Sequence, residues 1–189
     1  MQGGNFAGRL VPGSGAVRLF PVPTAFVRPY GIVVAPDGRP WFAEFGANRL
    51  ATIDPETLVL REVELPRKKA RQRRLALIAD GSVWYTGFAR AFLGCYRPGD
   101  GTVSEWRTPR GTDSAPYALA ADYRGHLWFV ETGMHPNRLI GFDPSLARFT
   151  PPTPIPCGGG TVRHMVFDHT SRSLWFGTDT DTIGRAQVP

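Results

Sequence analysis

The residues best able to do chemistry in this chain recur at two fixed distances from a tryptophan. Four tryptophans lie in matching surroundings: Trp41, Trp84, Trp128 and Trp175. Eleven residues before them stand, in order, Tyr30, Arg73, Tyr117 and His164. Three residues after them stand Glu44, Gly87, Glu131 and Thr178. Histidine has the near-neutral pKa that a general base needs, and carboxylates suit Mg²⁺, so these positions predict a polar site shared between copies of one repeat.

The repeat itself is visible in the spacing of these tryptophans, which is 43, 44 and 47 residues. Each tryptophan follows a turn sequence and precedes a second aromatic residue, as in Trp41-Phe42 and Trp128-Phe129. A fixed period in this range is typical of repeat proteins that build their function where the copies converge. Differences between the copies therefore indicate where that function lies.

The first full copy contains four short strand patterns. They cover residues 30–35, 40–45, 50–53 and 58–65, and turn sequences such as Pro36-Asp37-Gly38 and Asp54-Pro55-Glu56-Thr57 separate them. Four strands in such a copy match the size of a propeller blade, and no segment has the long 3.6-residue period of a helix. We therefore expect an all-β fold: a β-propeller of four-stranded antiparallel blades.

We expect one propeller domain over residues 1–189, with about four blades visible and with offset or incomplete ends. The expected units are a half blade at 1–22 and blades at 28–66, 72–109, 115–156 and 162–189, the last without its fourth strand. Two closures remain open. The strand at Ala16–Phe20 completes the last blade of a four-bladed ring, or the chain forms an open arc of a larger propeller. Unpaired blade edges in an open arc would favour self-association.

Blade geometry predicts where the candidate residues meet. The first strand of a blade is innermost, and its start lies on the same face as the end of the second strand. His164 is then the candidate catalytic base at the channel mouth, and Tyr30, Arg73 and Tyr117 are candidate substrate-binding residues. Mg²⁺ held by Glu44 and Glu131, or an arginine at position 28, 73 or 163, would balance developing negative charge.

A structural interpretation competes at each of these positions. The two glutamates would bond the backbone or pair with arginines, the tyrosines would pack with one polar end in water, and His164 would be satisfied within its strand. The other histidines, His126, His135 and His169, fall in turns.

The net charge of +6 comes from one stretch of the sequence. Six basic residues lie between Arg67 and Arg74, and without them 16 basic residues balance 16 acidic ones. The run is either a solvated loop or a rim that attracts anions, which favours a small and anionic ligand. No motif that stacks on bases or reads a groove accompanies it, so nucleic acid is not indicated.

The chain carries no sign of a membrane span or of a secretory signal, because its apolar runs are short. This is consistent with a cytoplasmic location if the first residue is the genuine start, and the compartment stays open. Cys95 and Cys157 have no metal-binding spacing; two buried free thiols are favoured over a disulfide.

The repeat resembles the virginiamycin B lyase (streptogramin lyase) propellers. The resemblance is carried by Pro29-Tyr30-Gly31-Ile32, Asp37-Gly38, Trp41-Phe42-Ala43-Glu44 and Asn48-Arg49-Leu50, and by Trp128-Phe129-Val130-Glu131 and Asn137-Arg138-Leu139-Ile140 in the third copy. It covers nearly the whole chain. It implies a seven-bladed ring that opens type B streptogramin antibiotics by elimination at the ester, with magnesium and a histidine base, and thus a role in antibiotic resistance.

Two hypotheses follow for the function. The first is a lyase-like enzyme that opens a cyclic ester or depsipeptide with His164 as the base and Mg²⁺ as the cofactor. The second is a non-catalytic propeller, or part of a larger one, that binds a ligand or a protein partner. The second is favoured by Val162 and Thr178, which stand where the family's catalytic blade has acids.

Overall fold

Antiparallel strands joined by short turns make up almost all of the regular structure. A computed structural model describes residues 3–156 and 160–189 of the chain. Within these ranges the one helical segment is a short 3-10 turn at Gly111–Asp113. The all-β prediction is therefore confirmed. It follows from the many β-branched and aromatic residues in runs of about five, each closed by Asp, Gly or Pro.

The strands form one two-stranded sheet and two regular four-stranded blades at the start of the chain. The two-stranded sheet contains β1 (Phe6–Leu10) and β2 (Val17–Pro21). The first blade contains β3 (Pro29–Val34), β4 (Pro40–Glu44), β5 (Arg49–Ile53) and β6 (Leu60–Glu64). The second contains β7 (Gln72–Leu77), β8 (Val83–Gly87), β9 (Phe92–Arg97) and β10 (Thr102–Arg107).

The third and fourth blades are less regular at their outer strands. The third contains β11 (Pro116–Ala121), β12 (Leu127–Glu131), β13 (Arg138–Asp143), β14 (Arg148–Phe149) and β15 (Thr153–Pro154). Its fourth strand is split because Pro151 and Pro152 cannot donate hydrogen bonds to β13. The fourth blade contains β16 (His164–Asp168), β17 (Ser173–Gly177) and β18 (Ile183–Gln187).

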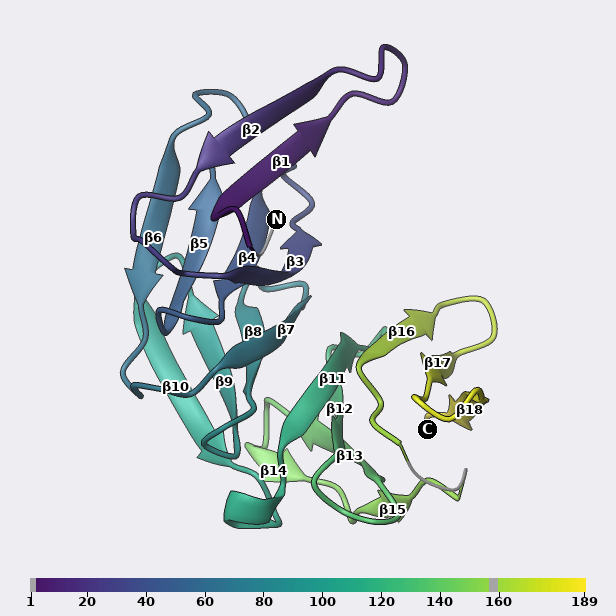
Figure 1. The fold of residues 1–189 in the computed structure, drawn as a ribbon. Helices are drawn as coiled ribbons and strands as arrows, with labels where there is room; N and C mark the ends of the chain where they lie inside the picture. Colours follow the sequence, from purple (N-terminus) through teal and green to yellow (C-terminus); the bar gives the residue numbers. More distant parts are fainter. Residues whose placement is uncertain (1–2, 157–159) are drawn as a thin grey trace.

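The blades follow one another around an open arc (Figure 1). The hairpin β1–β2 lies at one end, the sheet β16–β18 lies at the other, and the first strand of each blade is nearest the axis. Strands β1 and β2 pair with each other, and β18 pairs with β17. Of the two expected closures, the four-bladed ring completed by Ala16–Phe20 is thus wrong, and the arc is what forms.

The hydrophobic core lies between neighbouring blades. Trp41 packs in a cluster shared with the second blade, Trp84 in one shared with the third, and Trp128 in one shared with the fourth. These three side chains are at most 9% exposed, whereas Trp175 of the last blade is 39% exposed. The repeated tryptophan is therefore the residue that joins one blade to the next, and burying such a side chain stabilises the contact by about 2–3 kcal/mol.

The asparagine of the repeat motif also has a structural role. Asn48 donates from Nδ2 to the carbonyl of Leu65, and its Oδ1 accepts from the amide of Gln72. Asn5 makes the same kind of contacts, to the carbonyl of Val22 and from the backbone N–H of Val27. Such an asparagine fastens the link that runs from one blade to the inner strand of the next, which explains why the motif recurs.

Three smaller findings complete the fold. No helix in the described residues is long and apolar enough to cross a membrane. Cys95 is buried and free, and burial raises the pKa of its thiol. Cys157 lies outside the described residues, so the expectation for its thiol stays a prediction.

Candidate functional site

Three of the residues that the sequence singles out sit in β-bulges at the start of inner strands. The pairing of β3 with β4 shifts in register around Tyr30, so that Tyr30 and Gly31 together lie opposite Ala43. Equivalent shifts surround Arg73 in β7 and Tyr117 in β11. A bulge places an extra residue on one strand and re-aims its side chain, which here turns three polar side chains toward the axis of the arc.

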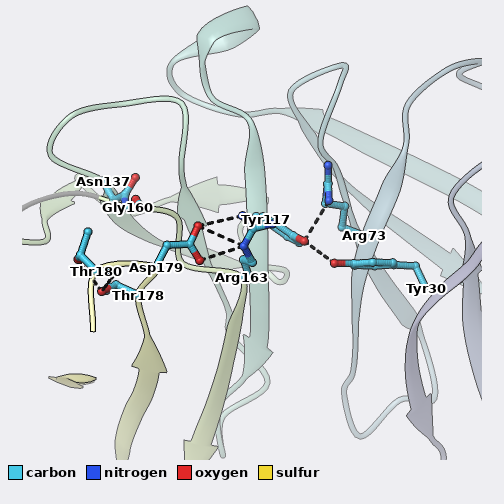
Figure 2. Close-up of polar contacts among 9 residues, drawn as sticks. All are labelled: Tyr30, Arg73, Tyr117, Asn137, Gly160, Arg163, Thr178, Asp179 and Thr180. Carbon is cyan, nitrogen blue, oxygen red and sulfur yellow. Dashed lines mark hydrogen bonds and ion pairs between the residues drawn. The ribbon is translucent and has the colours of Figure 1, made fainter. Parts of the chain in front are cut away.

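These three side chains meet. The hydroxyl oxygens of Tyr30 and Tyr117 lie 2.5 Å apart, and Nη1 of Arg73 donates to the hydroxyl of Tyr117 at 3.0 Å. Figure 2 shows both contacts, which join three successive blades. The structure therefore brings together the candidate substrate-binding residues Tyr30, Arg73 and Tyr117, which are 87 residues apart at the extremes.

Aromatic rings surround the guanidinium of Arg73. Its Cζ lies 4.0 Å from the ring centre of Phe88, 4.4 Å from that of Tyr117 and 5.0 Å from that of Phe45. The guanidinium is thus held by the faces of several rings, each of which attracts a cation. Because Tyr117 is only 1% exposed, Tyr30 and Arg73, both half-buried, are the members of this group that a ligand can reach.

The two tyrosines have pKa values shifted in opposite directions. Burial and the hydrogen bond with Tyr117 raise the pKa of Tyr30. Burial also opposes ionisation of Tyr117, but its hydrogen bond with Tyr30 and the charge of Arg73 outweigh that effect and lower its pKa. Of the two phenols, Tyr117 therefore ionises first, next to Arg73, and Tyr30 keeps its proton as a hydrogen-bond donor.

Arg163 extends this group into the fourth blade. It forms a two-pronged ion pair with Asp179, with Nη2 2.9 Å from Oδ2, and its Cζ lies 5.9 Å from the ring centre of Tyr117. The backbone carbonyl of Arg163 accepts from Nε of Arg74 at 2.8 Å. We call Tyr30, Arg73, Tyr117 and Arg163 the tyrosine–arginine cluster. From the sequence, Arg163 was one of three arginines that could balance negative charge. Its position next to His164 is the feature that could have placed it at the site.

His164 lies next to this cluster rather than within it. His164 starts β16 and lies opposite Gly177, which comes two residues after Trp175. The bulged residues of β3 lie opposite Ala43, which likewise comes two residues after Trp41. Its side chain is exposed, and its Nδ1 accepts the backbone N–H of Met165 at 3.0 Å. Partial burial and the positive charge of Arg74 lower the pKa of the imidazole, so His164 is neutral at pH 7.

The two candidate magnesium ligands have separate surroundings. Glu44 is fully buried, and burial together with the nearby carboxylate of Glu62 raises its pKa to about 8. Glu131 is also fully buried, and its Oε1 accepts the backbone N–H of Arg110 at 3.1 Å. Among the described residues, neither carboxylate hydrogen-bonds a member of the tyrosine–arginine cluster. The sequence predicted both glutamates at the channel mouth. It could not show that their side chains are buried, because a repeat position specifies the backbone and not the direction of the side chain.

These surroundings do not suit a magnesium site made from Glu44 and Glu131. Mg²⁺ requires ionised oxygen ligands and several waters around it, whereas Glu44 is fully buried and its pKa of about 8 keeps it mostly protonated at neutral pH. Among the described residues, no group of three or more His, Cys, Asp or Glu side chains could hold a metal ion. Magnesium binding stays a prediction.

Known proteins resemble this chain along its whole length. The family model of the Virginiamycin B lyase family matches residues 2–188. A virginiamycin B lyase of Nocardia farcinica (strain IFM 10152) is 38% identical over 80 residues, which are 42% of this chain and 28% of that protein. The chain therefore covers only part of the length of this relative.

Solved structures have the same fold. The selenomethionine-substituted virginiamycin B lyase of Staphylococcus aureus superposes with a TM-score of 0.83 at 24% identity, covering 99% of this chain and 64% of that one. A catalytically inactive histidine-to-alanine variant of that enzyme, solved with quinupristin, gives a TM-score of 0.82 at 24% identity over 98% and 64% of the two chains. The chain thus spans about two thirds of the length of these enzymes. From its repeat motifs and the family match over residues 2–188, this chain belongs to the virginiamycin B lyase family.

Proposed function

We propose that this chain supplies the channel-mouth site of a lyase that opens a cyclic ester or depsipeptide by elimination. The observation that carries the proposal is the convergence of Tyr30, Arg73 and Tyr117 from three blades beside a neutral histidine, His164, from a fourth. A base near neutral pKa, a cation and a phenol donor are what proton removal next to a carbonyl requires.

In the proposed reaction His164 removes a proton from the carbon beside a carbonyl group. The electron pair of that C–H bond forms a C=C bond, and the neighbouring C–O bond of the ester breaks. The ester oxygen leaves with that bond's electrons as part of a carboxylate. The ring opens without the addition of water, so substrate and product have the same mass.

The tyrosine–arginine cluster would stabilise the negative charge that develops on the carbonyl oxygen. Arg73 supplies a fixed positive charge, and Tyr30 supplies a hydrogen-bond donor once its hydroxyl turns from Tyr117 to the substrate. His164 must first release the N–H of Met165 from its Nδ1, and its exposed side chain has room to turn. These steps use the chain's own residues and no metal ion.

A ligand-binding propeller without catalysis is the second candidate. It is favoured by the surroundings of His164, where Arg74 is the charge that acts on the imidazole and no carboxylate raises its basicity. Val162 is buried and Thr178 bonds Thr180 and Thr182, so neither position supplies an acid. In this case the same cluster would bind an anionic small molecule.

The distinguishing experiment is turnover of a type B streptogramin, followed by chromatography and mass spectrometry. The lyase proposal expects a linear product of unchanged mass. His164→Ala should lower the rate of its formation at least about 100-fold. His169→Ala should leave that rate unchanged, because His169 is exposed in a turn. It also expects similar rates with magnesium and with a chelator. Binding without any product would support the second candidate instead.

A turnover rate that falls when a chelator is added would show that the reaction needs a metal ion. The matching control is the double variant Glu44→Gln with Glu131→Gln, examined by thermal melting with and without millimolar magnesium. A melting shift that disappears in this variant would show that these carboxylates hold the ion, because a ligand that binds only the folded state raises its melting temperature.

A further inference from the structure

A basic cavity lies on the links that lead into the first two blades, outside the tyrosine–arginine cluster. Its volume is about 710 Å³, within the range of about 300–1,000 Å³ typical of small-molecule sites. The residues that define its chemistry are Phe26, Arg28, Phe45, Lys68, Lys69 and Arg71. We call it the link pocket.

In the described part of the chain, the four cations of the link pocket form no ion pair. Among the described residues, no ion pair or side-chain hydrogen bond involves Arg28, Lys68, Lys69 or Arg71. The other basic residues of the same run are engaged: Arg67 pairs with Glu105, and Arg73 bonds Tyr117. One acid, Glu64, also lines the pocket. The excess of positive charge found in the sequence is therefore concentrated here.

Comparison of the repeats shows that this side-chain set is special to two links. Fifteen and thirteen residues before the repeat tryptophan stand Phe26 and Arg28 in the first link, and Lys69 and Arg71 in the second. The same positions hold Asp113 and Ala115 in the third link and Gly160 and Val162 in the fourth. Because the fold does not require cations at these positions, their presence at neighbouring links indicates a binding role.

The backbone holds these side chains in place. Phe26, Arg28, Lys69 and Arg71 all have left-handed backbone angles, with φ of 59°, 51°, 60° and 54°. The residue between each pair, Val27 or Ala70, is fully buried, so its neighbours must project outward. Backbone bonds from Gly46 to Val27 and from Ala89 to Ala70 fix both links. The cations are thus presented on ordered backbone.

The pocket also offers aromatic surface. Phe26 is 85% exposed, and Phe45 lies on the pocket wall with the guanidinium of Arg71 5.7 Å from its ring centre. An exposed phenylalanine beside unpaired cations suits a ligand with a flat ring and anionic groups. The planar forks of Arg28 and Arg71 match phosphate oxygens in pairs, and the lysines add point charges.

We propose that the link pocket binds a phosphorylated aromatic small molecule, with phosphates on Arg28, Lys69 and Arg71 and the ring on Phe26. The link pocket adjoins the channel-mouth site through Phe45, whose ring contacts both Arg71 and Arg73, but the charged residues proposed to bind the ligand are different ones. It gives the chain a second ligand, whether or not the lyase proposal holds.

The test is calorimetric titration of the chain with three probes in magnesium-free buffer: ATP, inorganic tripolyphosphate and adenosine. We expect ATP to bind more tightly than either of the other two. Lys69→Gln with Arg71→Gln should weaken ATP at least about tenfold, because two charge-assisted contacts are lost. Phe26→Ala should weaken ATP and leave tripolyphosphate unchanged.

The control is Arg90→Gln with Arg107→Gln, which removes the same charge from exposed positions outside the pocket. An equal loss in this control would overturn the proposal, because the effect would then belong to the net charge. Absence of ATP binding at millimolar concentration would also overturn it. His164→Ala should leave ATP binding intact, which separates this result from that of the lyase test. Melting curves of each variant check that it folds.

Discussion

Single residues at the same repeat position differ in chemical state because their neighbours differ. Glu44 and Glu131 both stand three residues after a tryptophan and both are fully buried. Glu44 lies near another carboxylate, Glu62, and its pKa rises to about 8, whereas Glu131 accepts a backbone N–H from Arg110. Repeat position alone does not assign a function to either of them.

The raised pKa of Glu44 predicts a stability that depends on pH. In the unfolded chain this carboxyl ionises near its ordinary pKa of 4.5, and in the folded chain only near 8. Between these values unfolding releases a proton, so the free energy of unfolding falls as pH rises from 4.5 to 8. In Glu44→Gln, the free energy of unfolding should fall by about 1–3 kcal/mol less over this pH range than in the parent chain.

Urea unfolding of both proteins at pH 5 and pH 8 measures this difference. Glu131→Gln, at the matching position of the third blade, serves as the control. Parallel pH profiles for the parent chain and Glu44→Gln would contradict the shifted pKa.

At the scale of elements, the bulged inner strands carry the site. The bulges in β3, β7 and β11 place Tyr30, Arg73 and Tyr117 at equivalent points, and close contact between neighbouring bulges lets the three side chains meet. Gly31 belongs to the first bulge, and a Cβ at this position would overlap the backbone carbonyl oxygen of Arg73. The spacing between blades at the channel mouth therefore depends on this glycine.

Gly31→Ala should lower the free energy of unfolding by about 2 kcal/mol, because the overlap is with backbone and cannot be relieved by side-chain rotation. The control is Gly177→Ala, in β17, where a Cβ would meet nothing within 4 Å. That change should stay within about 0.5 kcal/mol. Chemical denaturation of the two variants checks the difference, and equal stabilities would contradict the close packing at the bulge.

At the scale of the whole molecule, the chain is an arc with exposed ends. In the part of the chain that the structure describes, no further blade packs against Trp175, which is 39% exposed, and Ile183 on β18 is 80% exposed. Strand β18 pairs with β17 on one side, and no other strand of residues 3–156 and 160–189 pairs with its second edge. Such an edge is a template for association between chains.

We therefore expect the chain to self-associate with rising concentration through this edge. Ile183→Lys should weaken association about tenfold, because a charged residue on an edge opposes pairing with a second strand. Leu146→Lys is the control, since Leu146 is 67% exposed but lies in a turn. Sedimentation velocity over a range of concentrations measures the effect. A single species at all concentrations would refute it.

The fold could be predicted from the sequence because local signals repeat. The tryptophan spacing, the Asp-Gly and Asp-Pro turns and the short apolar runs each act over a few residues, and four copies reinforce one another. The same regularity predicted that Tyr30, Arg73 and Tyr117 share one face. Inner strands that start alike must end near the same axis, and the hydrogen bonds among these residues bear this out.

Only the tertiary structure decided which polar side chains reach one another. It turned Glu44 and Glu131 into the blades, added Arg163 to the cluster, and gathered the unpaired cations of two links around one pocket. These outcomes depend on side-chain direction, on burial and on contacts between residues far apart in the sequence. A repeat pattern specifies backbone position, whereas ionisation and pairing depend on the few ångströms around each atom, and those distances are set only when the blades pack.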